Sequence, residues 1–94
     1  MTITDVKIRR LYNQERLKAL VSVTFDNAFV VHDIKIIKGP ERLFVAMPSR
    51  EEEKRVYRDI AHPIGQEMRQ KLESAIFSAY DDALKKLSDS DNKH

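Results

Sequence analysis

The segment LKALVSVTFDNAFVVHDIKIIK, residues 17–38, predicts a β-hairpin. Apolar and polar residues alternate through its first half, which is the pattern of a strand with one buried face. Asp26 and Asn27 interrupt this pattern, and both residue types tolerate the positive φ angles of a two-residue turn. Such a turn places Val21 opposite His32 and brings two apolar rows together. A shift by one residue would destroy that match, so we expect a well-defined register.

Further strands are expected on both sides of this hairpin. Residues 3–11 alternate in the same way and predict a strand that precedes it. Residues 43–47 and 56–60 are shorter strand candidates. The charged segment 48–55 between them is expected to be a hairpin loop.

The C-terminal part of the chain predicts one long amphipathic helix. Pro63 precedes it, Gly65 is an acceptable N-cap, and Glu67 lies in the first turn, where the helix dipole favours a carboxylate. Residues 88–94 have no apolar side chain, and we expect them to form a disordered tail. The apolar face of the helix comprises Ile64, Met68, Leu72, Ala75, Ile76, Ala79, Ala83 and Leu87, widened by Phe77, Tyr80 and Leu84.

These elements predict a single α+β domain over residues 1–87. It would contain a mostly antiparallel sheet of about five strands followed by the C-terminal helix, which covers one face of the sheet. The other face would carry Phe29, Val31 and Ile37, which are too apolar for a plain solvent face. We therefore expect a homodimer that buries this second face or pairs sheet edges.

The composition is that of a small globular protein with little charge imbalance. The 94 residues contain no cysteine, and 17 Lys and Arg stand against 15 Asp and Glu. This excess permits binding to nucleic acid through a local patch but does not require it. The first residues do not resemble a signal peptide and no stretch is apolar enough for a membrane span, so we expect a cytoplasmic protein without a membrane partner.

The residue pattern argues against an enzyme. No cysteine and no serine in a glycine-rich elbow offers a nucleophile, and no glycine-rich loop could hold a phosphate. The histidine spacing does not fit a metal site, so we expect no metal, cofactor or small-molecule substrate. His32 is interpreted as a buried, hydrogen-bonded core residue rather than a functional one. For Asp59 and His62 we favour a turn network at the entry to the helix.

The most charged stretch offers one candidate site for nucleic acid. Arg50, Lys54 and Arg55, with Arg58 just beyond, could contact phosphates from an exposed loop. Glu51, Glu52 and Glu53 balance these charges, so composition alone favours a solvated hairpin tip.

A second candidate site is a basic patch on the outer face of the sheet, formed by Lys7, Arg9, Lys18 and Lys35. The alternative is that these four side chains form an ordinary charged outer face. Phe29 is the only strand aromatic expected to face this patch, so the sequence predicts no platform on which bases could stack.

Four segments, read in order, resemble the stage V sporulation protein G (SpoVG) family. They are ITDVKIRR at 3–10, FVVHDIKII at 29–37, LFVAMPSR at 43–50 and RDIAHPI at 58–64. The resemblance covers about residues 2–84. The two last motifs, in this order, are the most specific part of it.

This resemblance implies a small bacterial protein that dimerises through its sheet. It implies a role in regulating asymmetric septation and sporulation, or related regulation in bacteria that do not sporulate. Several members bind DNA and some bind RNA, through the basic loop after the Met-Pro-Ser motif and parts of the C-terminal helix. Arg50 and Arg58 match basic positions of the family.

Position 51 departs from the family pattern, in which a second basic residue often follows the first. Here Glu51 to Glu53 precede Lys54 and Arg55, so the basic role has moved along the loop or binding is weak. We therefore expect a homodimeric regulator that binds DNA and possibly RNA. The alternative is a protein-interaction regulator of cell division that barely touches nucleic acid.

Overall fold

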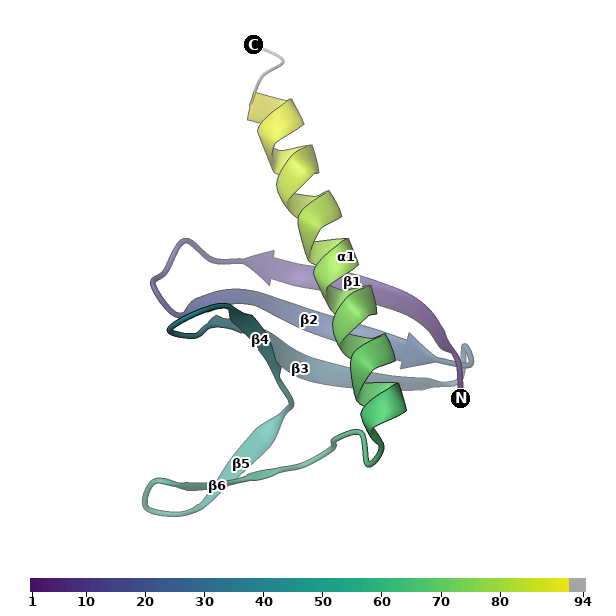
Figure 1. Cartoon of the computed structure of the whole chain (residues 1–94), viewed down its shortest axis with the longest axis vertical. Helices are drawn as coiled ribbons and strands as arrows, with labels where there is room; N and C mark the ends of the chain where they lie inside the picture. Colours follow the sequence, from purple (N-terminus) through teal and green to yellow (C-terminus); the bar gives the residue numbers. More distant parts are fainter. Residues whose placement is uncertain (92–94) are drawn as a thin grey trace.

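The computed structural model describes residues 1–91 and contains six strands and one helix (Figure 1). The elements are β1 (Ile3–Leu11), β2 (Leu17–Phe25), β3 (Phe29–Lys38), β4 (Leu43–Ala46), β5 (Ser49–Glu53), β6 (Val56–Asp59) and α1 (Gln66–Asp91). The first four strands form an antiparallel sheet in the order β1-β2-β3-β4, and β5 and β6 form a separate antiparallel ribbon. The predicted α+β fold is confirmed.

The helix α1 crosses one face of the four-stranded sheet (Figure 1). Leu72, Ile76 and Tyr80 are buried side chains of the helix, and they pack in one core with the inward row of the sheet. The helix continues past β1, and Leu84 and Leu87 on this projecting end are partly exposed (Figure 1). The sheet contributes Ala19, Val21, Val23, Phe25, Ile34, Ile36 and Val45 to the core.

The start of the helix agrees with its sequence signals. The backbone N–H of Arg69 donates to the carbonyl of Gly65 at 3.1 Å, as expected for a helix that begins after this residue. The helix runs to Asp91 and therefore includes residues 88–91, which we had assigned to a disordered tail. Residues 92–94 of that predicted tail lie outside the described residues. Ile64, assigned to the apolar face, precedes the helix and is 97% exposed.

The turn of the central hairpin forms as predicted, but its register is different. Asp26 and Asn27 have φ angles of 51° and 52°, and the N–H of Ala28 donates to the carbonyl of Phe25 at 2.9 Å. Phe25 then pairs with Phe29 instead of Ala28. The pairing of β2 with β3 is therefore shifted by one residue from the predicted register at the first residue of β3.

A β-bulge in β3 shifts the register again. His32 and Asp33 lie between the pairs Val23–Val31 and Val21–Ile34, and Asp33 has a φ of 64°. The bulge inserts an extra residue, so side chains before and after it follow different alternations. Val31 therefore packs against the core and does not need the second cover that we predicted.

His32 is the clearest consequence of this bulge. The predicted pairing with Val21 is wrong, and the imidazole lies on the exposed side of the strand instead of in the core. Its Nδ1 atom lies 2.7 Å from Oγ of Ser22, so the predicted hydrogen bonding is present without the predicted burial.

The charged segment after β4 is also more regular than predicted. Residues 49–53 form strand β5, and only Lys54 and Arg55 form the turn to β6. All side chains of β5 and β6 are exposed, and the ribbon extends away from the four-stranded sheet (Figure 1). Exposed charge gives no alternation of apolar residues, so the sequence pattern did not predict this strand.

Within residues 1–91, no helix combines the length and apolar character needed to cross a membrane.

Candidate nucleic-acid interface

The ribbon of β5 and β6 brings two predicted binding residues together. Arg50 and Arg58 are backbone partners across the antiparallel pair, so their side chains leave the same face of the ribbon. Both are exposed. Like charges placed opposite each other repel, and a phosphate between them would relieve that repulsion.

Two glutamates of β5 make contacts with other residues of the ribbon. Oε2 of Glu52 lies 3.0 Å from Nε of Arg58, and both side chains remain substantially exposed. Glu51 accepts hydrogen bonds from the backbone N–H of Arg55 at 3.2 Å and from the hydroxyl of Tyr57 at 3.4 Å. Glu51 thus supports the turn, whereas Glu52 occupies Arg58 and would compete with any phosphate for it.

Lys54 and Arg55 lie at the tip of the ribbon rather than beside Arg50 and Arg58. Arg55 has a φ of 66°, which fits a tight turn between two strands. The ribbon therefore separates its four cations into an arginine pair and a basic tip. Residues 49–59 contain four cations and four carboxylates, so their charges cancel.

The sheet face opposite α1 is called the open face, and it is defined on β2 by Leu20, Ser22 and Thr24. Lys7 pairs with Ser22, and Lys35 pairs with Leu20, so both lie on this face as predicted. Arg9 lies in a bulge of β1, and Arg9 and Lys7 both line a hollow on this face.

Arg10 is a residue of the open face that the sequence analysis missed. It pairs with Leu20, on the opposite side of β2 from Lys35. Strict alternation would have placed Arg10 with the apolar side chains of β1. The bulge at Arg9 reverses this placement, and no residue in the stretch signals a bulge.

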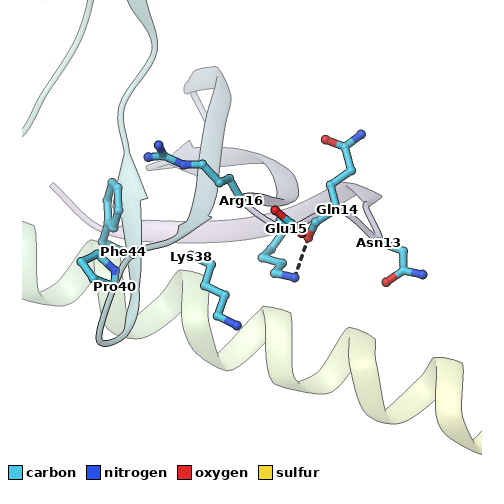
Figure 2. A pocket seen from close by; sticks show the side chains of 9 residues that line it. Asn13, Gln14, Glu15, Arg16, Lys38, Pro40 and Phe44 are labelled. Atoms are coloured by element: carbon cyan, nitrogen blue, oxygen red, sulfur yellow. Dashed lines mark hydrogen bonds between the residues drawn. The ribbon is translucent and has the colours of Figure 1, made fainter.

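Lys18 lines a different hollow from Lys7 and Arg9. Its Nζ donates to the carbonyl of Gln14 at 2.6 Å (Figure 2). Arg16 and Lys38 line the same hollow, and neither was predicted as a site residue. Arg16 belongs to the connection between β1 and β2, and Lys38 is the last residue of β3, so only the folded chain brings Lys38 near Arg16 and Lys18.

The predicted network of Asp59 and His62 is present only as neighbouring side chains. Both line one shallow hollow next to Tyr57 and Arg58. The Nδ1 atom of His62 lies 3.1 Å from the carbonyl oxygen of Pro63, and His62 is exposed. Within the described residues, no group of three or more His, Cys, Asp or Glu side chains is placed to hold a metal ion.

Comparison with known proteins places the chain in a family. The SpoVG family model matches residues 1–82. A protein of Clostridioides difficile is 57% identical over 84 residues, which cover 89% of this chain and 91% of the relative. A protein of Heliobacterium modesticaldum is 55% identical over 84 residues, with 89% and 94% covered. Both carry the name "Putative septation protein SpoVG", which refers to no enzymatic activity. The chain therefore belongs to the SpoVG family.

Proposed function

We propose that this protein is a homodimeric, cytoplasmic regulator of septation, sporulation or related gene expression that binds DNA or RNA. The observation that carries nucleic-acid binding is the pairing of Arg50 and Arg58 on a fully exposed ribbon. A two-stranded ribbon has the dimensions to enter the major groove of duplex DNA, and arginines recognise phosphates and guanine edges. The names of the relatives support the link to septation.

The charge balance of the ribbon predicts the kind of binding. Its carboxylates cancel its cations, and Glu52 is already paired with Arg58. Long-range attraction to nucleic acid is therefore weak, and binding depends on close contacts from Arg50, Arg58 and the tip. Two ribbons in a dimer would double these contacts.

A homodimer is supported by the apolar side chains near the ribbon. Val56 is 45%, Tyr57 63%, Ile60 69% and Ile64 97% exposed. They lie within one segment, 56–64, and such a cluster is typical of a surface covered by a partner. An isolated two-stranded ribbon is also marginally stable in water, so a second copy would stabilise it.

The open face is a less suitable dimer surface. It carries Lys7, Arg9, Arg10 and Lys35, and burying these cations without partners would cost free energy. The edge at β4 and the segment 56–64 are therefore the better candidates for self-association. A regulator that uses segment 56–64 to bind a different protein is the second candidate function, favoured by the balanced charge of the ribbon.

The proposal is tested by binding of a DNA fragment and an RNA of the same length as salt is varied. Two lost phosphate contacts should lower the slope of log affinity against log salt by about 2 on duplex DNA, so Arg50→Ala/Arg58→Ala should be less salt-dependent than the wild type. A matched variant, Arg42→Ala/Lys85→Ala, removes the same charge away from the ribbon. Equal slopes for wild type and the ribbon variant would place the contact elsewhere. A wild type that binds neither nucleic acid at low salt would favour the protein-interaction regulator.

A further inference from the structure

The open face carries the net positive charge of the chain. Its strand pairing and its hollow place four cations there, which are Lys7, Arg9, Arg10 and Lys35. Asp5 also lines the hollow, and Asp33 lies in the bulge of β3. When both carboxylates are counted, the face keeps an excess of two positive charges with His32 neutral. The whole chain has a net charge of +2, so the charges of all other residues cancel.

The cations of the open face differ from those of the ribbon in having no carboxylate bound to them. All four side chains are exposed, and within residues 1–87 none of them takes part in an ion pair. In the ribbon, by contrast, the charges cancel and Glu52 is paired with Arg58. A surface with an excess of one sign of charge attracts a polyanion at long range. The open face therefore has the attraction for nucleic acid that the ribbon lacks.

Two β-bulges bring the polar groups of the hollow together. Arg9 lies in the bulge of β1 and lines the hollow with Lys7, and the bulge of β3 places His32 beside them. The Nδ1 atom of His32 lies 2.7 Å from Oγ of Ser22. When the serine hydroxyl donates to Nδ1, the neutral imidazole carries its proton on Nε2, which is then a donor for an external group. Two cations and one further donor suit a phosphate, whose oxygens accept hydrogen bonds.

The turn end of the hollow is held in place by hydrogen bonds to β1. The N–H of Asn27 donates to Oγ1 of Thr4 at 2.9 Å, and Oγ1 of Thr4 donates to the carbonyl of Thr24 at 3.3 Å. The N–H of Thr2 donates to Oδ1 of Asp26 at 2.8 Å. A ligand that enters the hollow therefore meets a largely preformed surface, which lowers the entropic cost of binding.

We propose that the open face is a second contact surface for nucleic acid, which binds backbone phosphates and supplies the long-range attraction. Lys7, Arg9 and His32 hold one phosphate in the hollow, and Arg10 and Lys35 contact neighbouring phosphates. A duplex of about 20 base pairs is about 68 Å long and exceeds the longest extent of the chain, 48 Å, so it extends beyond this face. This inference rests on the proposed nucleic-acid function and adds a contact surface to it.

The test measures the affinity of the chain for a labelled duplex and a labelled RNA of about 20 nucleotides between about 50 and 200 mM salt. Lys7→Gln/Arg9→Gln removes two cations from the hollow, and the control Lys38→Gln/Arg42→Gln removes the same charge elsewhere. Lys38 pairs with Leu43, which packs against the core, so Lys38 leaves the other face of the sheet. For the duplex, only the hollow variant should show a slope of log affinity against log salt that is lower by about 2. The wild type should then lose about 10-fold more affinity than this variant over the salt range.

Binding kinetics separate the open face from the ribbon. Arg10→Gln/Lys35→Gln, like the hollow variant, should mainly slow association, because long-range attraction acts before contact. Arg50→Ala/Arg58→Ala should mainly speed dissociation, because it removes close contacts. Phosphate contacts carry no sequence information, so the open-face variants should weaken binding to two duplexes of unrelated sequence equally.

Titration of isotopically labelled wild type with the duplex locates the contact by NMR without any substitution. The amide signals of Lys7, Ser22 and His32 should shift. Unchanged signals there, together with wild-type slopes for both open-face variants, would overturn the contact surface, and the proposed function would survive if binding still depended on Arg50 and Arg58. Signals that shift with protein concentration instead of with DNA would assign the face to a second copy and would also overturn it. A wild type that binds neither probe would contradict both proposals.

Discussion

Oγ of Ser22 and Nδ1 of His32 lie 2.7 Å apart across the bulge of β3. Ser22 is 5% exposed and His32 is exposed, so the imidazole covers the hydroxyl group and gives it a hydrogen-bond partner. A buried hydroxyl without a partner would be destabilising. The pair thus links the bulge of β3 to the centre of β2.

This relationship predicts coupling between substitutions at the two positions. Ser22→Ala and His32→Leu should each lower the free energy of unfolding, and the double variant should lose about 0.5–1.5 kcal/mol less than the sum of the two. Urea unfolding of the wild type, both single variants and the double variant measures this. Losses that add within about 0.3 kcal/mol would show that the bond does not stabilise the bulge.

The helix provides a sharper prediction about stability. Ile76 is fully buried and Leu87 is 52% exposed, although both belong to the apolar face predicted from sequence. Ile76→Ala should cost about 2–5 kcal/mol because it leaves a cavity under the helix, whereas Leu87→Ala should change stability by less than about 1 kcal/mol. Thermal and urea unfolding compare the two. Similar losses at both positions would mean that the projecting end of α1 is packed against something in solution.

The sequence predicted the strands and the helix of this fold better than the register in which the strands pair. The alternation of residues 17–25 and the helical spacing up to Tyr80 reflect burial, and burial leaves a repeating apolar pattern. The turn at Asp26 and Asn27 was predicted because its backbone angles demand particular residue types. A bulge leaves no such pattern, so the register of β3 and the placement of His32 were wrong.

The candidate site was harder to predict for a related reason. Arg50 and Arg58 were expected near one loop, but their direct pairing depends on β5 being a strand, and its charged residues show no alternation. Arg10 was missed because a bulge reverses its face. Arg16 and Lys38 meet only in the folded chain. The residue types were therefore predictable, whereas their grouping depended on backbone irregularities.

Assembly can be tested by comparing the two candidate dimer surfaces. Ile64→Glu places a charge in segment 56–64, and Val30→Glu places the same charge on the open face, where Val30 is 44% exposed. If segment 56–64 is buried in the dimer, Ile64→Glu should be monomeric and Val30→Glu dimeric, since burying an unpaired charge is costly. Sedimentation at micromolar concentration measures the mass of each.

A monomeric wild type would contradict the proposed homodimer. The reverse pattern, in which only Val30→Glu is monomeric, would place the interface on the open face.

The last prediction concerns Glu52, which holds Arg58 in an exposed ion pair. Glu52→Gln and Glu53→Gln each remove one negative charge from β5, so both reduce long-range repulsion of nucleic acid equally. Only Glu52→Gln also releases Arg58 for a phosphate. It should therefore bind duplex DNA more tightly than Glu53→Gln, with a slope of log affinity against log salt that is steeper by about 0.9. Stability should change by less than about 0.5 kcal/mol in both, because the residues are exposed. The advantage of Glu52→Gln should shrink at high salt as screening increases. Equal affinities and slopes for the two variants would show that Arg58 makes no phosphate contact, and Arg50 would then have to act with Lys54 and Arg55 at the tip.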